Sequence, residues 1–129
     1  MGVRTSRISH YLCQWKIILI YQICSLYLDI WVPSSATKDS KLPVKVWVYG
    51  GSETEGSISD PLYDGCNTAE AGSILVTINY RLGPLGFMAL ETAGIYGNQG
   101  IQDLILGLEW VRDNIAAFSG DPVWQSASN

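Results

Sequence analysis

Two adjacent glycines followed by a serine are the residues in this sequence best suited to chemistry. Gly50, Gly51 and Ser52 come directly after a valine-rich run at residues 44–49 that predicts a β-strand. Ligands bind at the carboxyl ends of strands in an open α/β sheet. Glycine lets the backbone approach a substrate closely, and backbone N–H groups there can stabilise an oxyanion as it forms. From this segment alone, a plain strand-ending turn is the alternative interpretation.

A hydrolytic site usually also needs a histidine base, and His10 is the only histidine in the sequence. It lies in a basic leader, because every charged side chain before Asp29 is an arginine or a lysine. An apolar run at residues 17–21 gives this leader some likeness to a secretory signal. Gln14, Lys16 and Gln22 break the apolar character on either side of this run, however, and the run is too short for a transmembrane helix. We therefore predict no membrane span and a segment 1–24 that is foreign to the domain after it, with a signal peptide as the alternative.

The composition predicts a globular chain without a metal or a nucleic-acid partner. Hydrophobic residues make up 47% of the sequence and charged residues 16%, which is typical of a folded domain. The net charge of −4 argues against binding to nucleic acid. The three cysteines cannot all pair with one another, and no cluster of histidine and cysteine indicates a metal site. Cysteine usage therefore does not identify the cellular compartment, and we expect no cofactor.

The elements expected to position the glycines alternate between strands, loops and helices. The apolar patterns predict strands at residues 26–32, 44–49 and 74–80, a short helix at 67–71 and a long helix at about 98–118. A long loop is predicted at residues 52–65 and a sharp loop at 83–86. Strands separated in this way favour a parallel α/β sheet.

Several longer segments of the sequence resemble one enzyme family. The sequences SLYLDIWVP, LPVKVWVYGG, YDG, ILVTINYRLGPLGF, GNQGIQDLILGLEWVRDNIAAF and SGDP, between residues 25 and 122, are similar in kind and order to the type-B carboxylesterases and lipases, which include the cholinesterases. The resemblance implies an α/β-hydrolase fold, here a partial one with an incomplete, mostly parallel sheet and one long helix. It also implies hydrolysis of a small-molecule carboxylic ester by a serine nucleophile, a histidine base and an acid, without a cofactor.

The same resemblance assigns a role to the glycines. In the family, N–H groups of the glycine-rich loop form the oxyanion hole together with one N–H that follows the serine. By position, Gly50, Gly51 and Ser52 form this loop here, with Gly51 and Ser52 as the donors. Tyr49 stands where many esterases have histidine. Ser52 replaces a third glycine, which would cost about 1 kcal/mol or more if that position needs a positive φ.

The chain departs from the family at the expected nucleophile. The sequence Q-S-A around Ser126 resembles the core of the nucleophile elbow, but Trp124 and Ser128 replace its two glycines. We expect residues 123–129 to form a divergent tail and Ser126 to be only a remnant of the nucleophile motif. We therefore assign no catalytic residue in this chain. His10 matches no family position. Cys24 is one residue out of register, which puts the family's disulfide in doubt.

Three further expectations concern charge, folding and the alternative functions. Arg81 and Asp121, the charged residues inside the two strongest motifs, are predicted to form an ion pair. The strand at residues 44–49 is predicted to be an open edge of the sheet and the helix at 99–118 to lack packing partners, which would make the isolated chain insoluble or molten. The alternatives to an inactive esterase fragment are a catalytically dead binding protein and a gene-model artefact. The oligomeric state and the localisation are not predicted.

Overall fold

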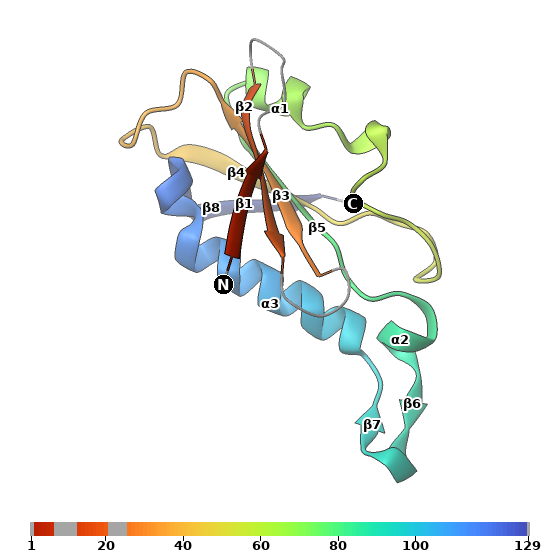
Figure 1. Ribbon diagram of the computed structural model, residues 1–129. Helices are drawn as coiled ribbons and strands as arrows, with labels where there is room; N and C mark the ends of the chain where they lie inside the picture. The colour runs from red at the N-terminus through yellow and green to blue at the C-terminus, as the bar shows by residue number, and fades with distance from the viewer. Residues whose placement is uncertain (1, 7–12, 21–25, 129) are drawn as a thin grey trace.

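A computed structural model describes residues 2–6, 13–20 and 26–128, and it describes side chains only for residues 26–123. Its centre is one six-stranded sheet with the long helix α3 (Gln99–Asn114) lying along one face (Figure 1). The strand order across the sheet is β1-β2-β3-β5-β4-β8. These strands are β1 (Gly2–Ser6), β2 (Cys13–Ile20), β3 (Leu28–Pro33), β4 (Leu42–Trp47), β5 (Ile74–Ile78) and β8 (Gly120–Ser128).

The sheet is mixed, whereas the sequence favoured a mostly parallel one. Strand β4 runs parallel to both of its neighbours, β5 and β8. Strands β1, β2, β3 and β5 pair antiparallel with one another in that order. Only the two connections that contain helices, β4 to β5 and β5 to β8, are long enough to return the chain to the same end of the sheet, as parallel pairing requires. The predicted partial α/β sheet with one long helix is present, but its pairing is mixed.

The two helical connections lie on opposite faces of the sheet. The first contains the 3₁₀ turn η1 (Pro61–Tyr63) and α1 (Cys66–Glu70), which packs on the face that carries Trp31. The second contains α3, which packs on the other face. Strand β5 lies on one side of β4 and β8 on the other, so right-handed crossovers must place their helices on opposite faces.

The main core lies between α3 and the sheet. Alternate residues of the central strands point toward the helix, as the period of two in a strand requires. They meet Val111 and Ile115, which are fully buried. Gly107 brings the helix close to the sheet, because a Cβ there would lie 3.0 Å from the Ile78 side chain. The buried strand residues of this core are Leu28, Ile30, Val32, Val44, Val46, Ile74, Val76 and Ile78.

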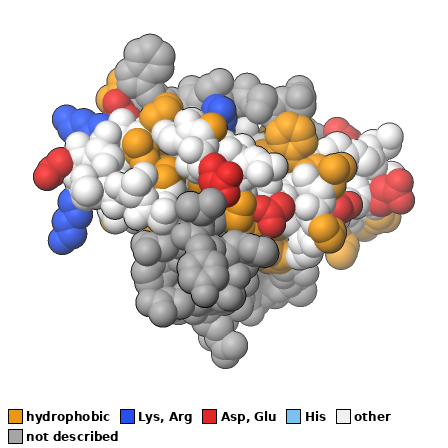
Figure 2. Space-filling view, turned by 90° about the horizontal axis from the view of Figure 1, so that it is seen from above, with side chains coloured by type: hydrophobic (Ala, Val, Ile, Leu, Met, Phe, Trp, Pro, Cys, Tyr) orange, Lys and Arg blue, Asp and Glu red, His pale blue; other side chains and the backbone are white. Residues whose placement is uncertain are grey.

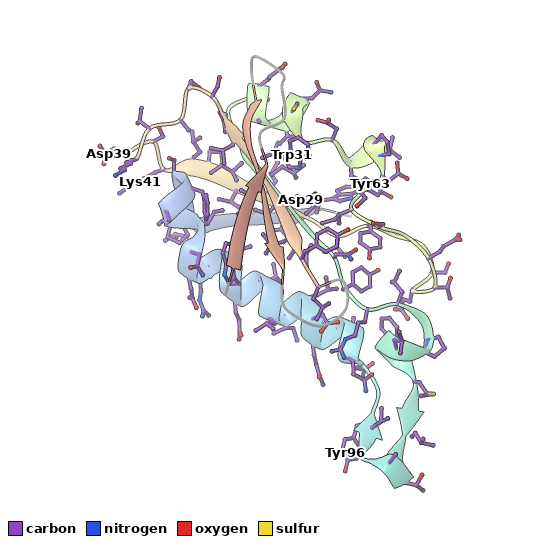
Figure 3. The ribbon with its side chains drawn as sticks, in the orientation of Figure 1. Asp29, Trp31, Asp39, Lys41, Tyr63 and Tyr96 are labelled. Carbon is purple, nitrogen blue, oxygen red and sulfur yellow. The ribbon has the colours of Figure 1, made fainter. Side chains whose placement is uncertain are left out.

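Most predicted elements are present with small shifts of their ends. The long helix consists of α3 followed by the 3₁₀ turn η3 (Ile115–Phe118), and the short helix is α1. The predicted sharp loop at residues 83–86 is instead a short helix, α2 (Gly83–Phe87), with Pro84 in its first turn. After it comes a small hairpin of β6 (Ala89–Leu90), the 3₁₀ turn η2 (Glu91–Ala93) and β7 (Ile95–Tyr96), which the sequence analysis did not predict. Tyr96 marks the part of this hairpin far from the sheet (Figure 3).

The predicted open edge at residues 44–49 is wrong. Strand β4 pairs with β8 from Leu42, opposite Gly120, to Trp47, opposite Ser128. Residues 123–128 of the expected tail therefore belong to a strand that is nine residues long. Ser119, at a φ of 70°, reverses the chain after η3 so that β8 can satisfy the backbone groups of β4. The outer edge of the sheet on this side is β8.

In the view from above, apolar and acidic side chains are interspersed over the described part of the surface, and basic side chains gather mainly toward one end (Figure 2). Within the described ranges, no helix is long and apolar enough to cross a membrane.

Residues 2–6 and 13–20 form β1 and β2, whereas His10 and Cys24 lie outside the described residues. The proposed foreign origin of residues 1–24 stays a prediction.

Candidate functional site

The topology indicates where a ligand would bind. Because α1 and α3 lie on opposite faces, the chain leaves β4 toward one face and leaves β5 toward the other. A crevice forms outside the carboxyl ends of neighbouring strands at such a switch point. The segment that follows β4 is the glycine loop, defined here as residues 50–56. The segment that follows β5 begins with Asn79 and Tyr80.

The backbone of the glycine loop adopts conformations that few residues tolerate. Gly51 has a φ of 140°, and a Cβ at this position would overlap the carbonyl oxygen of Glu55. Ser52 follows at a φ of 53° and Glu53 at 61°, both in the left-handed region. The sequence analysis anticipated strain at Ser52 if its φ were positive, and its φ is positive. Only glycine enters this region without a steric cost.

Hydrogen bonds close the glycine loop and leave two donors available. The Gly51 carbonyl accepts from the Thr54 N–H at 3.0 Å, from the Glu55 N–H at 3.2 Å and from the Thr54 hydroxyl at 3.0 Å. The N–H groups of Gly51 and Ser52 donate to no other residue in the part of the chain that the structure describes. Two neighbouring donors at the end of a strand can therefore bind an acceptor from outside the chain.

Buried tyrosines hold the start of the glycine loop against β5. Tyr49 is 2% exposed, and its hydroxyl donates to Oδ1 of Asn79 at 2.8 Å. In return the Tyr80 hydroxyl donates to the Tyr49 carbonyl at 3.1 Å, and the two ring centroids are 4.9 Å apart. Gly56 allows this packing, since a Cβ there would lie 2.5 Å from the Tyr49 ring. Tyr49 therefore fixes the direction in which the chain enters Gly50.

The environment of Tyr49 predicts a pH dependence of stability. Burial raises the pKa of Tyr49 to about 12 from its ordinary value of 10.0. Below pH 10 the phenol is protonated in both folded and unfolded chains; between about pH 10 and pH 12 only the unfolded chain ionises, so stability should fall. Tyr49→Phe should weaken this fall. Urea unfolding between about pH 9 and pH 12 measures it.

A second buried tyrosine, Tyr80, also contributes to the alkaline loss of stability. Burial also raises the pKa of Tyr80, so a smaller fall should persist in the variant. Tyr96→Phe is the control, because Tyr96 is 78% exposed and its substitution should leave the alkaline profile as it is. Equal slopes for the wild type and Tyr49→Phe would contradict the prediction.

A hollow lies beside the glycine loop. The Gly83 N–H donates to the Glu53 carbonyl at 2.6 Å, which ties the start of α2 to the loop. A hollow of about 450 Å³ lies between these segments, and its walls are largely apolar. It is a shallow hollow that opens widely to solvent, and Ser52, which carries one of the available N–H groups, is part of its lining. Its lining residues are Ser52, Glu53, Thr54, Gly83, Pro84, Phe87 and Met88.

Arg81 pairs with Asp103, so the predicted ion pair with Asp121 is wrong. Nε of Arg81 donates to Asp103 at 2.7 Å, Nη2 donates to its other carboxylate oxygen at 2.8 Å, and the Arg81 backbone N–H donates at 3.1 Å. The carboxylate raises the pKa of the Arg81 guanidinium, chiefly through these hydrogen bonds. Asp103 lies near the start of α3, whereas Asp121 lies beyond its other end, roughly 18 Å along the helix axis. Asp121 instead accepts from the Val123 N–H at 2.9 Å.

The structure does not bring Ser126 to the glycine loop. Ser126 lies in β8 opposite Lys45, and Gly50 follows five residues after Lys45. At about 3.3 Å per residue, this separates Ser126 from Gly50 by roughly 16 Å along the strand direction. His10 lies outside the described residues. The described ranges contain no group of three or more side chains that could hold a metal ion.

Sequence reasoning missed two contributors to this site. Asp103 is a charged residue that the sequence analysis did not single out, yet it is buried in α3 together with Gly100, beside the partly buried Leu104. The available signal in the sequence was its spacing of three residues from Gly100, which places the two residues on the same face of a helix. Asn79, which accepts from the Tyr49 hydroxyl, carried no signal beyond its place at the end of a strand.

Comparisons with known proteins identify the family. A model of the carboxylesterase family matches residues 24–123. The chain is 46% identical over 105 residues to the bile salt-activated lipase of Homo sapiens, covering 75% of this chain and 14% of that protein. It is 45% identical over 100 residues to the para-nitrobenzyl esterase of Bacillus subtilis, covering 75% of this chain and 20% of that protein.

The solved structures agree with these sequences. A thermophilic PNB esterase superposes with a TM-score of 0.72 at 44% identity, over 79% of this chain and 21% of that one. The chain therefore spans about a fifth or less of the length of these relatives and corresponds to part of the family's domain. Because the family model matches most of its length, the chain belongs to the carboxylesterase family.

Proposed function

We propose that the glycine loop is the oxyanion hole of a carboxylic-ester hydrolase and that Gly51 and Ser52 supply its N–H donors. The observation that carries this proposal is that both N–H groups are available at the carboxyl end of β4, beside the hollow. Gly50 provides the entry from the strand. The relatives named above include a lipase and an esterase, which supports an ester as the small-molecule substrate.

The loop would act on the charge that develops during ester hydrolysis. When a nucleophile attacks the ester carbonyl, its oxygen becomes negative, and N–H groups fixed in advance stabilise that charge without reorganising. The Gly51 carbonyl already binds three donors, so the loop is held in place before substrate arrives. The acyl or alcohol part of the ester would occupy the apolar hollow between the loop and α2. This step requires only main-chain atoms of the loop.

A graft into an active relative tests this role. Residues 42–87 would replace the corresponding segment of the Bacillus subtilis para-nitrobenzyl esterase. The graft should hydrolyse a para-nitrobenzyl ester with a kcat within about 100-fold of the parent, because one oxyanion donor is worth about that much and both donors are retained. Steady-state kinetics on the folded graft measure this. A folded graft with no turnover above buffer would overturn the proposal.

A catalytically dead binding protein is the second candidate, and the distance of Ser126 from the glycine loop favours it for this chain alone. We expect the purified 129-residue chain to hydrolyse an aryl ester no faster than buffer, since Ser126 lies roughly 16 Å from the loop and the described residues contain no histidine base. The chain would be assayed together with Ser126→Ala. Turnover that disappears in the Ser126→Ala variant would show that Ser126 is a working nucleophile and would contradict this expectation.

A further inference from the structure

A row of polar side chains crosses the sheet on the face opposite α3. Asp29 of β3 is in register with Thr77 of β5, and Thr77 is in register with Trp47 of β4. Their strand neighbours Ile30, Val76 and Val46 belong to the core under α3, so these three residues project from the other face. Figure 3 labels Asp29 and Tyr63 on this side of the molecule.

This row is shut off from solvent. Asp29 and Thr77 are each 1% exposed, and the indole Nε1 of Trp47 is fully buried. The Tyr63 ring covers Trp47, with the two ring centroids 5.7 Å apart. Close by, the Tyr27 hydroxyl lies 3.0 Å from the Ser59 hydroxyl and links the chain before β3 to the segment before η1.

Two donors in the row have no acceptor among the residues that the structure describes. The Thr77 hydroxyl and the Trp47 indole N–H form no hydrogen bond with any residue that the structure describes. Buried polar side chains almost always form at least one hydrogen bond, to protein or to ordered water. Both donors occupy neighbouring positions on strands about 4.8 Å apart, and the buried Asp29 carboxylate is the next group along the row.

We propose that one ordered water molecule binds in this row, between Trp47, Thr77 and Asp29. The water accepts from the indole N–H and from the Thr77 hydroxyl, and it donates to the Asp29 carboxylate. Three such partners are typical of a buried water. A cation would face two donors and an anion would face a carboxylate, so a neutral molecule that both donates and accepts fits this chemistry.

The water would connect the three central strands near the functional site. Trp47 is the last residue of β4, two residues before Tyr49, and Thr77 is the next-to-last residue of β5. A shared water fixes these strand ends relative to each other from the face opposite α3, while Tyr49 and Tyr80 fix them farther along the chain. The inference concerns packing beneath the site and does not depend on the proposed esterase function.

Nuclear magnetic resonance of the whole chain tests the binding directly. In a sample with labelled tryptophan, the Trp47 indole proton should show a cross-relaxation signal to a long-lived water. Trp110, which is partly buried on the α3 face, provides the comparison within the same molecule. Absence of the water signal at the Trp47 indole of the folded chain would overturn the proposal, whatever the behaviour of the variants.

Thermal unfolding of variants supplies a second test, because the direction of the change in Tm shows whether the Thr77 hydroxyl has a partner. Thr77→Val keeps the shape but removes the hydroxyl, and it should lower Tm by roughly 4 °C, as should Trp47→Phe. The double variant should lower Tm by less than the sum, because both changes disrupt the same water. Thr68→Val and Trp110→Phe are the matched controls and should shift Tm less.

Three other outcomes of the unfolding experiment would contradict the proposed water site. If the Thr77 hydroxyl simply lacks a partner, Thr77→Val should raise Tm. If Thr77 instead donates directly to Asp29, Thr77→Val alone should lower Tm while Trp47→Phe matches its Trp110→Phe control. Additive effects in the double variant would show two independent sites. Any of these outcomes overturns the proposal.

Discussion

Replacing Arg81 by methionine should lower the free energy of unfolding by about 3 kcal/mol, because it leaves a buried carboxylate without its partner. The Asp103 side chain is 6% exposed, and both of its oxygens accept from the guanidinium. Among the described residues, only the backbone N–H of residue 81 would still donate to Asp103 in the variant. The Arg81 side chain is 38% exposed, which places the expected loss at the low end for a buried pair. Urea unfolding of the whole chain measures this loss.

The chain contains a matched control for this substitution. Arg112 forms the same two-point contact with Asp113 at 2.7 and 3.2 Å, but both side chains are about 60% exposed. Arg112→Met should therefore leave the urea midpoint almost unchanged, since solvent screens exposed pairs. Arg81→Lys should fall between the two, because lysine keeps the charge but cannot match both oxygens in the same plane. A loss for Arg112→Met equal to that for Arg81→Met would contradict the argument from burial.

Replacing Gly51 by alanine in the grafted esterase should lower kcat/KM by roughly 100-fold or more, which is the cost of losing one oxyanion donor. Gly51 has a φ of 140°, and its added Cβ would meet the Glu55 carbonyl. The loop must then shift, and the N–H groups of Gly51 and Ser52 move with it. Because stabilisation of a developing charge acts in the transition state, the loss should appear mainly in kcat.

The control for Gly51→Ala is Gly72→Ala in the same graft. Gly72 also has a positive φ, 81°, but nothing lies within 4 Å of its added Cβ, and it follows α1 away from the loop. Gly72→Ala should therefore reduce stability without a comparable loss of kcat. If both variants lost kcat equally, the effect of Gly51→Ala would reflect general destabilisation, and the proposed oxyanion hole would lose its support.

The central elements could be predicted because local pattern and burial agree there. Residues 74–80 are nearly continuous in apolar side chains, and β5 is in fact covered on both faces. The helix at 98–118 has apolar residues at helical spacing and ends before a glycine and a proline. The glycine loop was identified by its place after a strand. For Ser52 the sequence analysis predicted only a conditional cost, and the structure meets the condition with a φ of 53°.

The remaining features depend on contacts that no local pattern encodes. Acidic residues occur at many positions along the sequence, and the tertiary packing of α3 selects Asp103 as the partner of Arg81. The pairing of β8 with β4 depends on where the chain turns at Ser119, because residues 123–128 alone have no strong strand pattern. The boundaries at residues 24 and 122 and the role of Ser126 stay predictions.

The opposite placement of α1 and α3 bears on how this site can change through evolution. One wall of the hollow comes from the glycine loop, and the other comes from the start of the segment that leads to α3. Each wall belongs to a separate excursion of the chain, so mutation can change Met88, which lines the hollow and is 47% exposed, without disturbing Gly51. Substrate preference can therefore diverge among descendants through one wall while selection preserves the other.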